Sequence, residues 1–484
     1  MSSNDIIKIG LDFGTHQTKI CIQKTPDEGH GEPSYEFFSF EDLEGGKSYF
    51  LPSIVQINQD DTLSYGFVDR SKEKNTGVAP KLELLEIPTI DINKVAKELF
   101  EKYASPQQDE SDIDAIEHML VLKSEMERQR IEHENAIRRS NYDEAIKKYR
   151  ASRNIFRYFK QATFSTREWD AKIDALRLCI WYLAYVIFLI EEKYGSLFSI
   201  HMGIPTDDQS FEKKRMLAVS TLASAYHLVE NVFDNDFKAF LNAHLDELLE
   251  KTKIIPFSND VKEEYAINVF PEAYAGLLSL TSRGKLTQGM SLTVDIGGGT
   301  TDISFFTIVG RKPCIYKYWS IPLGLNYLAE ESGFDYFEHD IKHEFKVGVV
   351  NAFNDEKTKV VRKLITMLYA KLSKTILGKD RLSAALKDRI LVYMGGGSTF
   401  SNVTNEHQPF TDVRRIEKTI WKEEQVKDKS EVEKLCTLLS VSFGLVSAKD
   451  DDEVELYSME SIFGEVPLKS DITIGNRYVD KDMV

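Results

Sequence analysis

Two aspartates flank a glycine-rich stretch whose composition suits the binding of phosphate groups. Residues 292–306 read LTVDIGGGTTDISFF, with Asp295 and Asp302 on either side of three glycines and two threonines. Glycine lets the backbone approach a ligand closely, so that N–H groups and hydroxyls can face its oxygens. Carboxylates beside phosphates require a cation such as Mg²⁺ between them. The stretch therefore predicts a phosphate site, with a plain glycine-rich hairpin as the alternative.

A second stretch, near the N-terminus, repeats this pattern. Residues 12–22 read DFGTHQTKICI and follow an apolar strand, as DIGGGTTDISF does from Asp295 onward. Four residues of the first stretch lie 283 positions before their counterparts in the second: Asp12, Gly14, Thr18 and Ile20 match Asp295, Gly297, Thr301 and Ile303. Chance produces one such turn easily, but seldom two in the same register. We therefore expect two related halves that face one nucleotide.

Composition and charge exclude several other classes of protein. The 484 residues are 42% hydrophobic and 29% charged, as in ordinary globular proteins. A formal charge of −16 argues against a broad surface for nucleic acid or anionic membranes. The four cysteines are far apart and the N-terminus lacks signal-peptide character, so we expect reduced thiols and a cytoplasmic location. The longest apolar run, residues 179–190, is too short to cross a bilayer and predicts a buried helix.

A charged segment interrupts the region between the two glycine turns. Residues from about 89 to 170 are charged on most sides and carry apolar residues at helical spacing. We expect a helical insertion there, arranged as a hairpin with a break at Ser140–Asn141, where Asn141 would cap the second helix. Its basic residues alternate with acidic ones, which favours a solvated face over a nucleic-acid-binding stripe.

Five motifs, in order, resemble those of the ATPase domain of the actin, DnaK-type heat-shock chaperone and sugar-kinase superfamily. The chaperone branch is the most similar. The two phosphate motifs correspond to GLDFGTHQTK (10–19) and VDIGGGTTD (294–302). The first connecting motif resembles FPEAYAG (270–276). The adenosine motif and the second connecting helix resemble VYMGGGSTF (392–400) and LSVSFGLVSA (439–448).

This resemblance implies an α/β, actin-like ATPase fold with two lobes. Each lobe would hold a mixed five-stranded sheet flanked by helices, with the nucleotide in the cleft between them. The first lobe would span residues 1–225, with the helical insertion at about 89–170, and the second would span 226–448. An acidic tail, 449–484, would follow; because only these 36 residues remain, we expect no separate peptide-binding domain.

The resemblance also implies which residues act on the metal and on water. Asp12 and Asp295 would hold the hydration shell of Mg²⁺, an ion that keeps several waters and takes few carboxylates directly. Asp302 would support those waters, with a turn-capping role as the alternative. Glu272 occupies the position that in this family orients or deprotonates the attacking water; its charge also suits a helix N-terminus.

Further residues would hold the nucleotide itself. Lys81, in PKLELL, is similar to the chaperone lysine that contacts the terminal phosphate, and Lys19 is the other candidate for this role. Lys374 would flank the adenine. The phosphates would be clamped by Gly14, Thr15, Gly297, Gly298, Gly299, Thr300 and Thr301. The adenosine would lie against Gly395, Gly396, Gly397 and Ser398.

We expect a slow, Mg²⁺-dependent ATPase that serves as a chaperone-like conformational switch on a protein partner. Hydrolysis in such a device is gated by motions of lids and lobes, and the helical insertion would contact the partner. An actin-like ATPase that self-assembles into filaments is the alternative. It is favoured by Pro-Glu-Ala at 271–273, a feature that resembles plasmid-segregating actin homologues more than chaperones. A small-molecule kinase ranks third, and we expect no direct binding to nucleic acid or membranes.

Overall fold

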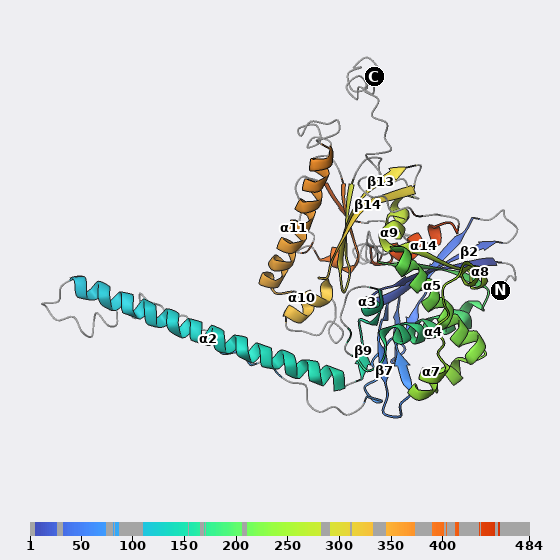
Figure 1. The fold of residues 1–484 in the computed structure, drawn as a ribbon, viewed down its shortest axis with the longest axis horizontal. Helices are drawn as coiled ribbons and strands as arrows, with labels where there is room; N and C mark the ends of the chain where they lie inside the picture. The colour runs from blue at the N-terminus through green and yellow to red at the C-terminus, as the bar shows by residue number, and fades with distance from the viewer. Residues whose placement is uncertain are drawn as a thin grey trace, which may run out of the picture. The chain divides into compact units, whose positions relative to one another are not determined.

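The structure is a computed structural model of a mixed α/β protein (Figure 1). It describes residues 5–26, 32–73, 81, 83–86, 110–152, 154–164, 169, 171–205, 211–281, 291–309, 312–332, 345–372, 390–400, 403, 412–415, 435, 437–450 and 454. The chain divides into two compact units. Unit 1 comprises Met1–Asp69 and Phe156–Val484, and unit 2 is Arg70–Ile155.

The first sheet of unit 1 is built around the N-terminal hairpin. Strands β1 (Asp5–Phe13) and β2 (Gln17–Pro26) pair antiparallel. The sheet order is β11-β10-β1-β2-β3, with β10 (Phe198–Ile204) and β11 (Ile267–Pro271) parallel to β1 and β3 (Ser34–Phe37) antiparallel to β2. A short sixth strand, β6 (Leu51–Pro52), also pairs with β2.

The second sheet repeats the order and the pairing directions of the first. Its hairpin is β12 (Ser291–Ile296) with β13 (Thr301–Val309), and β14 (Lys312–Ile321) adds antiparallel to β13. Strands β15 (Ile390–Met394) and β16 (Asp412–Arg415) continue parallel on the other side. The order β14-β13-β12-β15-β16 therefore matches β3-β2-β1-β10-β11 strand for strand.

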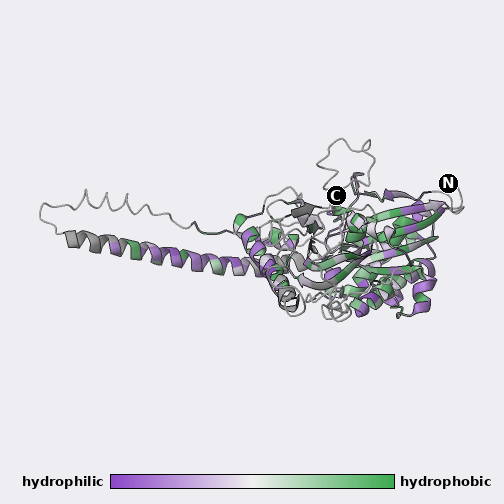
Figure 2. Ribbon diagram, turned by 90° about the horizontal axis from the view of Figure 1, so that it is seen from above, coloured by the Kyte–Doolittle hydropathy of each residue, from purple (hydrophilic) through white to green (hydrophobic). Residues whose placement is uncertain are grey.

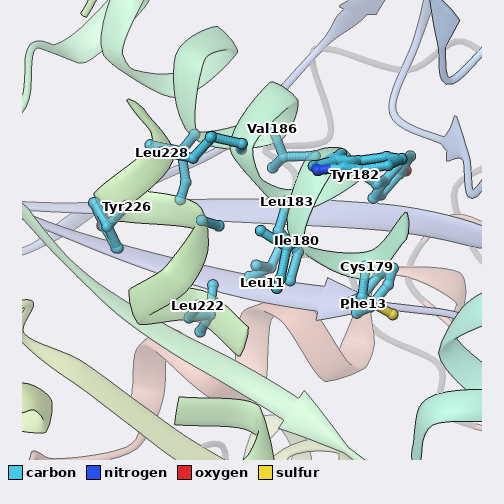
Figure 3. Close-up of a cluster of buried hydrophobic side chains, with 14 of the residues drawn as sticks. Leu11, Phe13, Cys179, Ile180, Tyr182, Leu183, Val186, Leu222, Tyr226 and Leu228 are labelled. Carbon is cyan, nitrogen blue, oxygen red and sulfur yellow. The ribbon is translucent and has the colours of Figure 1, made fainter. Parts of the chain in front are cut away.

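The C-terminal half of strand β1, residues 9–13, is buried on both faces because helices cover both sides of its sheet there. Ile9, Leu11 and Phe13 alternate along one face and belong to the same buried cluster as helix α4 (Ala175–Tyr194), the apolar run that predicted a buried helix (Figure 3). On the opposite face, Gly10 lies against helix α14 (Ser440–Ser447), where a Cβ would overlap the carbonyl oxygen of Ser442. These two helices hold the C-terminal end of β1 in place.

Further elements of unit 1 surround the two sheets. Helix α5 (Phe211–His227) packs beside α4, and helix α9 (Glu272–Thr281) crosses α14. The remaining long helix is α11 (Val347–Leu372). The short elements are β4 (Phe40–Glu41), β5 (Lys47–Ser48), β7 (Val55–Ile57), β8 (Leu63–Tyr65), β9 (Ile155–Phe156), α3 (Phe159–Phe164), η1 (Leu228–Val232), α6 (Phe237–Leu241), α7 (Leu245–Lys251), α8 (Asn259–Glu264), α10 (Leu325–Ser332) and η2 (Gly396–Thr399).

The described part of unit 2 consists mainly of helix α2 (Glu110–Ser152), which runs for 43 residues without interruption. The expected break at Ser140–Asn141 is therefore wrong, whereas residues 89–109 of the expected insertion lie outside the described residues. Serine and asparagine cost a helix only a fraction of 1 kcal/mol each, and no Gly or Pro follows to end it. Ion pairs one turn apart support the helix, such as Lys148 with Glu144 at 2.6 Å. Figure 2 shows that hydrophilic residues cover most of α2.

Two contacts in unit 1 hold the points where the chain leaves for unit 2 and returns. The backbone of Asp69 exchanges two hydrogen bonds with the side chain of Gln56 in β7, at 2.8 and 3.0 Å. Strand β9, where the chain returns, joins β7 and β8 in a three-stranded sheet. Among the described helices, none has the length and apolar character needed to cross a membrane.

Candidate functional site

The two glycine turns line one pocket in unit 1, with an empty volume of about 940 Å³ counted out to its open mouth. The first hairpin contributes Asp12, Gly14, Thr15 and Lys19. The second contributes Asp295, Gly297, Gly298, Gly299, Thr300 and Asp302. The turn after β15 adds Gly395 and Gly396, and the start of α9 adds Glu272.

The two hairpins have the same register, as their sequences predicted. Phe13 pairs with Thr18 just before the first turn, and Ile296 pairs with Thr301 just before the second. One step further from each turn, Asp12 lies opposite Lys19, and Asp295 lies opposite Asp302. Equivalent positions thus hold an aspartate with a cation in one hairpin and two carboxylates in the other.

In the first hairpin, Asp12 and Lys19 form an ion pair of 2.8 Å. Both side chains are largely buried, with 6% and 17% of their surfaces exposed. Burial alone would lower the pKa of Lys19, but Asp12, and more weakly Glu272 and Asp295, raise it above its ordinary value. Lys19 is therefore a charged residue that lines the pocket.

In the second hairpin, Asp295 has no such cation opposite it. Burial raises the pKa of Asp295 well above its ordinary value, and Asp302, Glu272 and Asp12 raise it further by repulsion, with Lys19 opposing them. Asp302 accepts a hydrogen bond of 2.6 Å from Ser320 Oγ, which orients its carboxylate. A bound cation would relieve the repulsion that the Asp295 carboxylate meets in this part of the pocket.

Lys160 is a site residue that the sequence analysis missed. It lies in α3, within the residues assigned to the helical insertion, but α3 belongs to unit 1 and Lys160 lines the pocket. Its Nζ donates to Glu272 Oε1 at 2.6 Å, with only 3% of the lysine side chain exposed, and lies 5.6 Å from the centre of the Phe13 ring. The available signal was a lysine inside the apolar run IFRYFKQATF, because a buried lysine needs a partner.

Close backbone approach explains several of the glycines. A Cβ on Gly298 would stand 2.7 Å from the Cβ of His16, and one on Gly299 would stand 2.7 Å from Gln161 Oε1. The two turns therefore meet with no room for larger residues. Gly395 has a φ of 74°, which favours glycine, and a Cβ there would overlap the Asp295 carboxylate.

The second turn is also fixed from behind by helix α10. The first amides of α10, those of Leu325 and Asn326, each donate to a carbonyl oxygen of the turn at 2.9 Å, to Gly297 and Gly298 respectively. These bonds hold the glycine backbone at the wall of the pocket.

Some expected site residues do not line this pocket. The Thr301 hydroxyl donates to the carbonyl oxygen of Leu323 at 2.8 Å, and Ser398 Oγ donates to that of Gly395 at 2.7 Å. Gly397, like Ser398, is buried behind the turn. Lys81 is exposed in unit 2 and is not among the described lining residues. Lys374 lies outside the described residues.

The charges of the pocket suit an anion that arrives with a divalent cation. Its described lining residues include four carboxylates, Asp12, Glu272, Asp295 and Asp302, against the two lysines Lys19 and Lys160. Glycine turns supply backbone N–H groups, the lysines supply positive charge, and the carboxylates supply partners for the waters of a cation. No protein-family model matches the chain, and no curated protein shows significant similarity to it.

Proposed function

We propose that the protein binds and slowly hydrolyses Mg²⁺-ATP, and that it works as a chaperone-like conformational switch on a protein partner. One observation carries this proposal: two glycine hairpins of the same register, each from a sheet of the same strand order, line a single pocket with two lysines and four carboxylates. A hairpin that served only as a turn would need neither a second hairpin of the same register nor buried charged side chains.

The same observation supports an actin-like fold with two lobes. One lobe would contain the sheet of β1, and the other would contain the sheet of β12, each flanked by helices. Helices α9 and α14 cross closely between them, and a Cβ on Gly444 of α14 would overlap the Ala275 carbonyl oxygen of α9. A crossing without intervening side chains suits a hinge, since two backbones can pivot there without repacking.

The residues of the pocket fit ATP and Mg²⁺. Gly298 and Gly299 line the pocket without side chains of their own, so phosphate oxygens would be able to reach their backbone N–H groups. Asp12, Asp295 and Asp302 offer carboxylates to a hydrated ion. When bound, Mg²⁺ would neutralise charge on the phosphates.

Lys160 and Glu272 would divide the catalytic work. In the structure, the Lys160 ammonium and the Glu272 carboxylate form an ion pair. The terminal phosphate would compete with Glu272 for Lys160, so binding would free the carboxylate to orient the attacking water or to accept its proton. Lys160 therefore takes the role that the sequence analysis gave to Lys81.

The test is a variant that removes only the charge of this carboxylate. Glu272→Gln should lower ATP turnover by about 10²-fold, the usual contribution of general base catalysis. Affinity for Mg²⁺-ATP should stay equal or become tighter, because Lys160 loses a competing carboxylate. Glu247→Gln, which removes a surface partner of Lys251, is the control and should hydrolyse ATP at the parental rate. Equal turnover in both variants would remove Glu272 from the mechanism.

A further inference from the structure

Helix α2 has one face that its own unit covers. Ile131 lies on this face, and only 6% of its surface is exposed. One turn along, the Asn135 side chain exchanges two hydrogen bonds with the backbone of Leu85, at 2.7 and 2.9 Å. The backbone at Leu85 is therefore held against this face.

Four apolar side chains are exposed on the other side of α2, on a face that Arg130 and His133 interrupt between Met126 and Ile137. Counted from Met119, the residues Leu122, Met126 and Ile137 lie about one, two and five turns further along α2. All four therefore share one face, roughly opposite Ile131 and Asn135. Their exposed fractions are 58%, 49%, 69% and 48%, although unpartnered apolar side chains of this size favour burial. We call these four residues the outer stripe.

The charges of α2 are divided between its two halves. Residues 110–127 hold six carboxylates against the single cation Lys123. Residues 128–152 hold seven cations against four carboxylates. The helix dipole favours such a bias only in the first and last turns, whereas here it extends along both halves.

We propose that the outer stripe binds the outer stripe of a second copy of this chain, with the two α2 helices antiparallel. In this orientation the acidic half of each helix lies along the basic half of the other, and Met119 lies near Ile137 of the second copy. A parallel pair would instead place like charges side by side. This self-association goes beyond the proposed ATPase function and does not depend on it.

The symmetry and size of this contact set its expected strength. An antiparallel pair uses the same surface on both copies, so it closes at a dimer and does not continue into a filament. The outer stripe spans only about 27 Å along the helix, at 1.5 Å per residue, and holds four apolar side chains. We therefore expect a dimer that dissociates on dilution.

Sedimentation of the full chain tests the association, at concentrations from about 1 µM to about 1 mM, the range of weak binding. The parent chain should shift from monomer to dimer, and added salt should weaken the dimer. Met126→Glu should raise the dissociation constant by about tenfold or more, because the dimer would bury an unpaired charge. Leu197→Glu changes a leucine of unit 1 that is 88% exposed, and should leave the equilibrium unchanged. A parent chain that remains monomeric throughout would overturn the proposal.

Cysteine cross-linking tests the orientation. In an oxidised mixture of Met119→Cys and Ile137→Cys chains, peptide mapping should find links between positions 119 and 137. Dominant links between two copies of position 119 would indicate a parallel pair and contradict the proposal. A dimer that Met126→Glu leaves intact would mean that another surface pairs the chains, which also contradicts it. Each variant should still bind Mg²⁺-ATP, so the proposed nucleotide function can fail or succeed separately.

Discussion

At the scale of single residues, the two hairpins differ most at the position opposite their aspartates. Asp12 faces Lys19, while Asp295 faces Asp302. Two of the four lining carboxylates thus lie in the second hairpin, where burial and neighbouring carboxylates raise the pKa of Asp295. A ligand that brings a cation would relieve this repulsion.

Asp295→Asn should therefore slow hydrolysis and stabilise the nucleotide-free protein. If the carboxylate helps to hold the metal, turnover should fall by about 10²–10³-fold, as when one preorganised electrostatic group is removed. Because the folded-state pKa of Asp295 exceeds its unfolded value, folding takes up a proton, and stability falls as pH rises above the ordinary range of aspartate. The asparagine variant should lose this part of the pH dependence and melt at a higher temperature at neutral pH.

Steady-state phosphate release and thermal melts from acidic to neutral pH measure both effects. Asp246→Asn, on an exposed position of α7, serves as the control. If Asp295→Asn matches this control in turnover and in melting, the second hairpin is only a turn.

Several site residues could be predicted from the sequence, and others could not, for physical reasons. Asp12, Asp295 and the glycines are local features, because a hairpin brings its own residues together. Lys160 reaches Glu272 across 112 positions, so its role depends on tertiary packing that no local pattern encodes. Thr301 was expected to clamp phosphate, but its hydroxyl satisfies the Leu323 carbonyl oxygen instead.

At the scale of elements, helices α9 and α14 can cross closely because a glycine at the crossing carries no side chain. Gly444 on α14 abuts the Ala275 carbonyl, and Gly276 on α9 lies against Met394, with only 2.7 Å from a Cβ to its sulfur. The two helices therefore cannot move closer together, and an added side chain would displace α9 if placed at Gly444, or Met394 of β15 if placed at Gly276.

Gly444→Ala should therefore destabilise the protein, by about 1–3 kcal/mol or more, the cost of overpacking a core. Gly348→Ala in α11 is the matched control, because a Cβ there would meet no atom within 4 Å. It should change stability by less than about 1 kcal/mol and in the stabilising direction, since alanine favours helix. Denaturant unfolding of both variants makes the comparison. Equal effects would mean that the two helices are not in tight contact in solution.

Among the helices and strands too, local features could be predicted from the sequence, and features that depend on distant residues could not. Apolar runs on either side of a glycine-containing turn predicted both hairpins, and the apolar run at 179–190 predicted α4. The continuity of α2 was missed, because Asn141 favours a helix start only where the preceding residues leave the helix. The matching order of the two sheets depends on strands far apart in sequence, such as β10 beside β1 and β15 beside β12.

At the scale of the whole molecule, unit 2 can be removed at a defined place. Asp69 and β9, on either side of it, are both held by β7. Replacing residues 74–153 with a short Gly/Ser linker should leave the affinity for Mg²⁺-ATP within about threefold, because the pocket's described lining residues all belong to unit 1. Binding to a protein partner, and the α2 dimer, should be lost. A folded deletion variant with much weaker ATP binding would show that unit 2 contributes to the nucleotide site.

The most direct test of the central claim is calorimetric titration of Mg²⁺-ATP into folded, nucleotide-free protein. It should be done at two temperatures, so that a binding enthalpy near zero at one of them does not hide the reaction. The two hairpins around one pocket predict a single site per chain, with a dissociation constant of about 1 µM or lower. The absence of binding at both temperatures, in protein whose circular dichroism confirms the fold, would contradict the account.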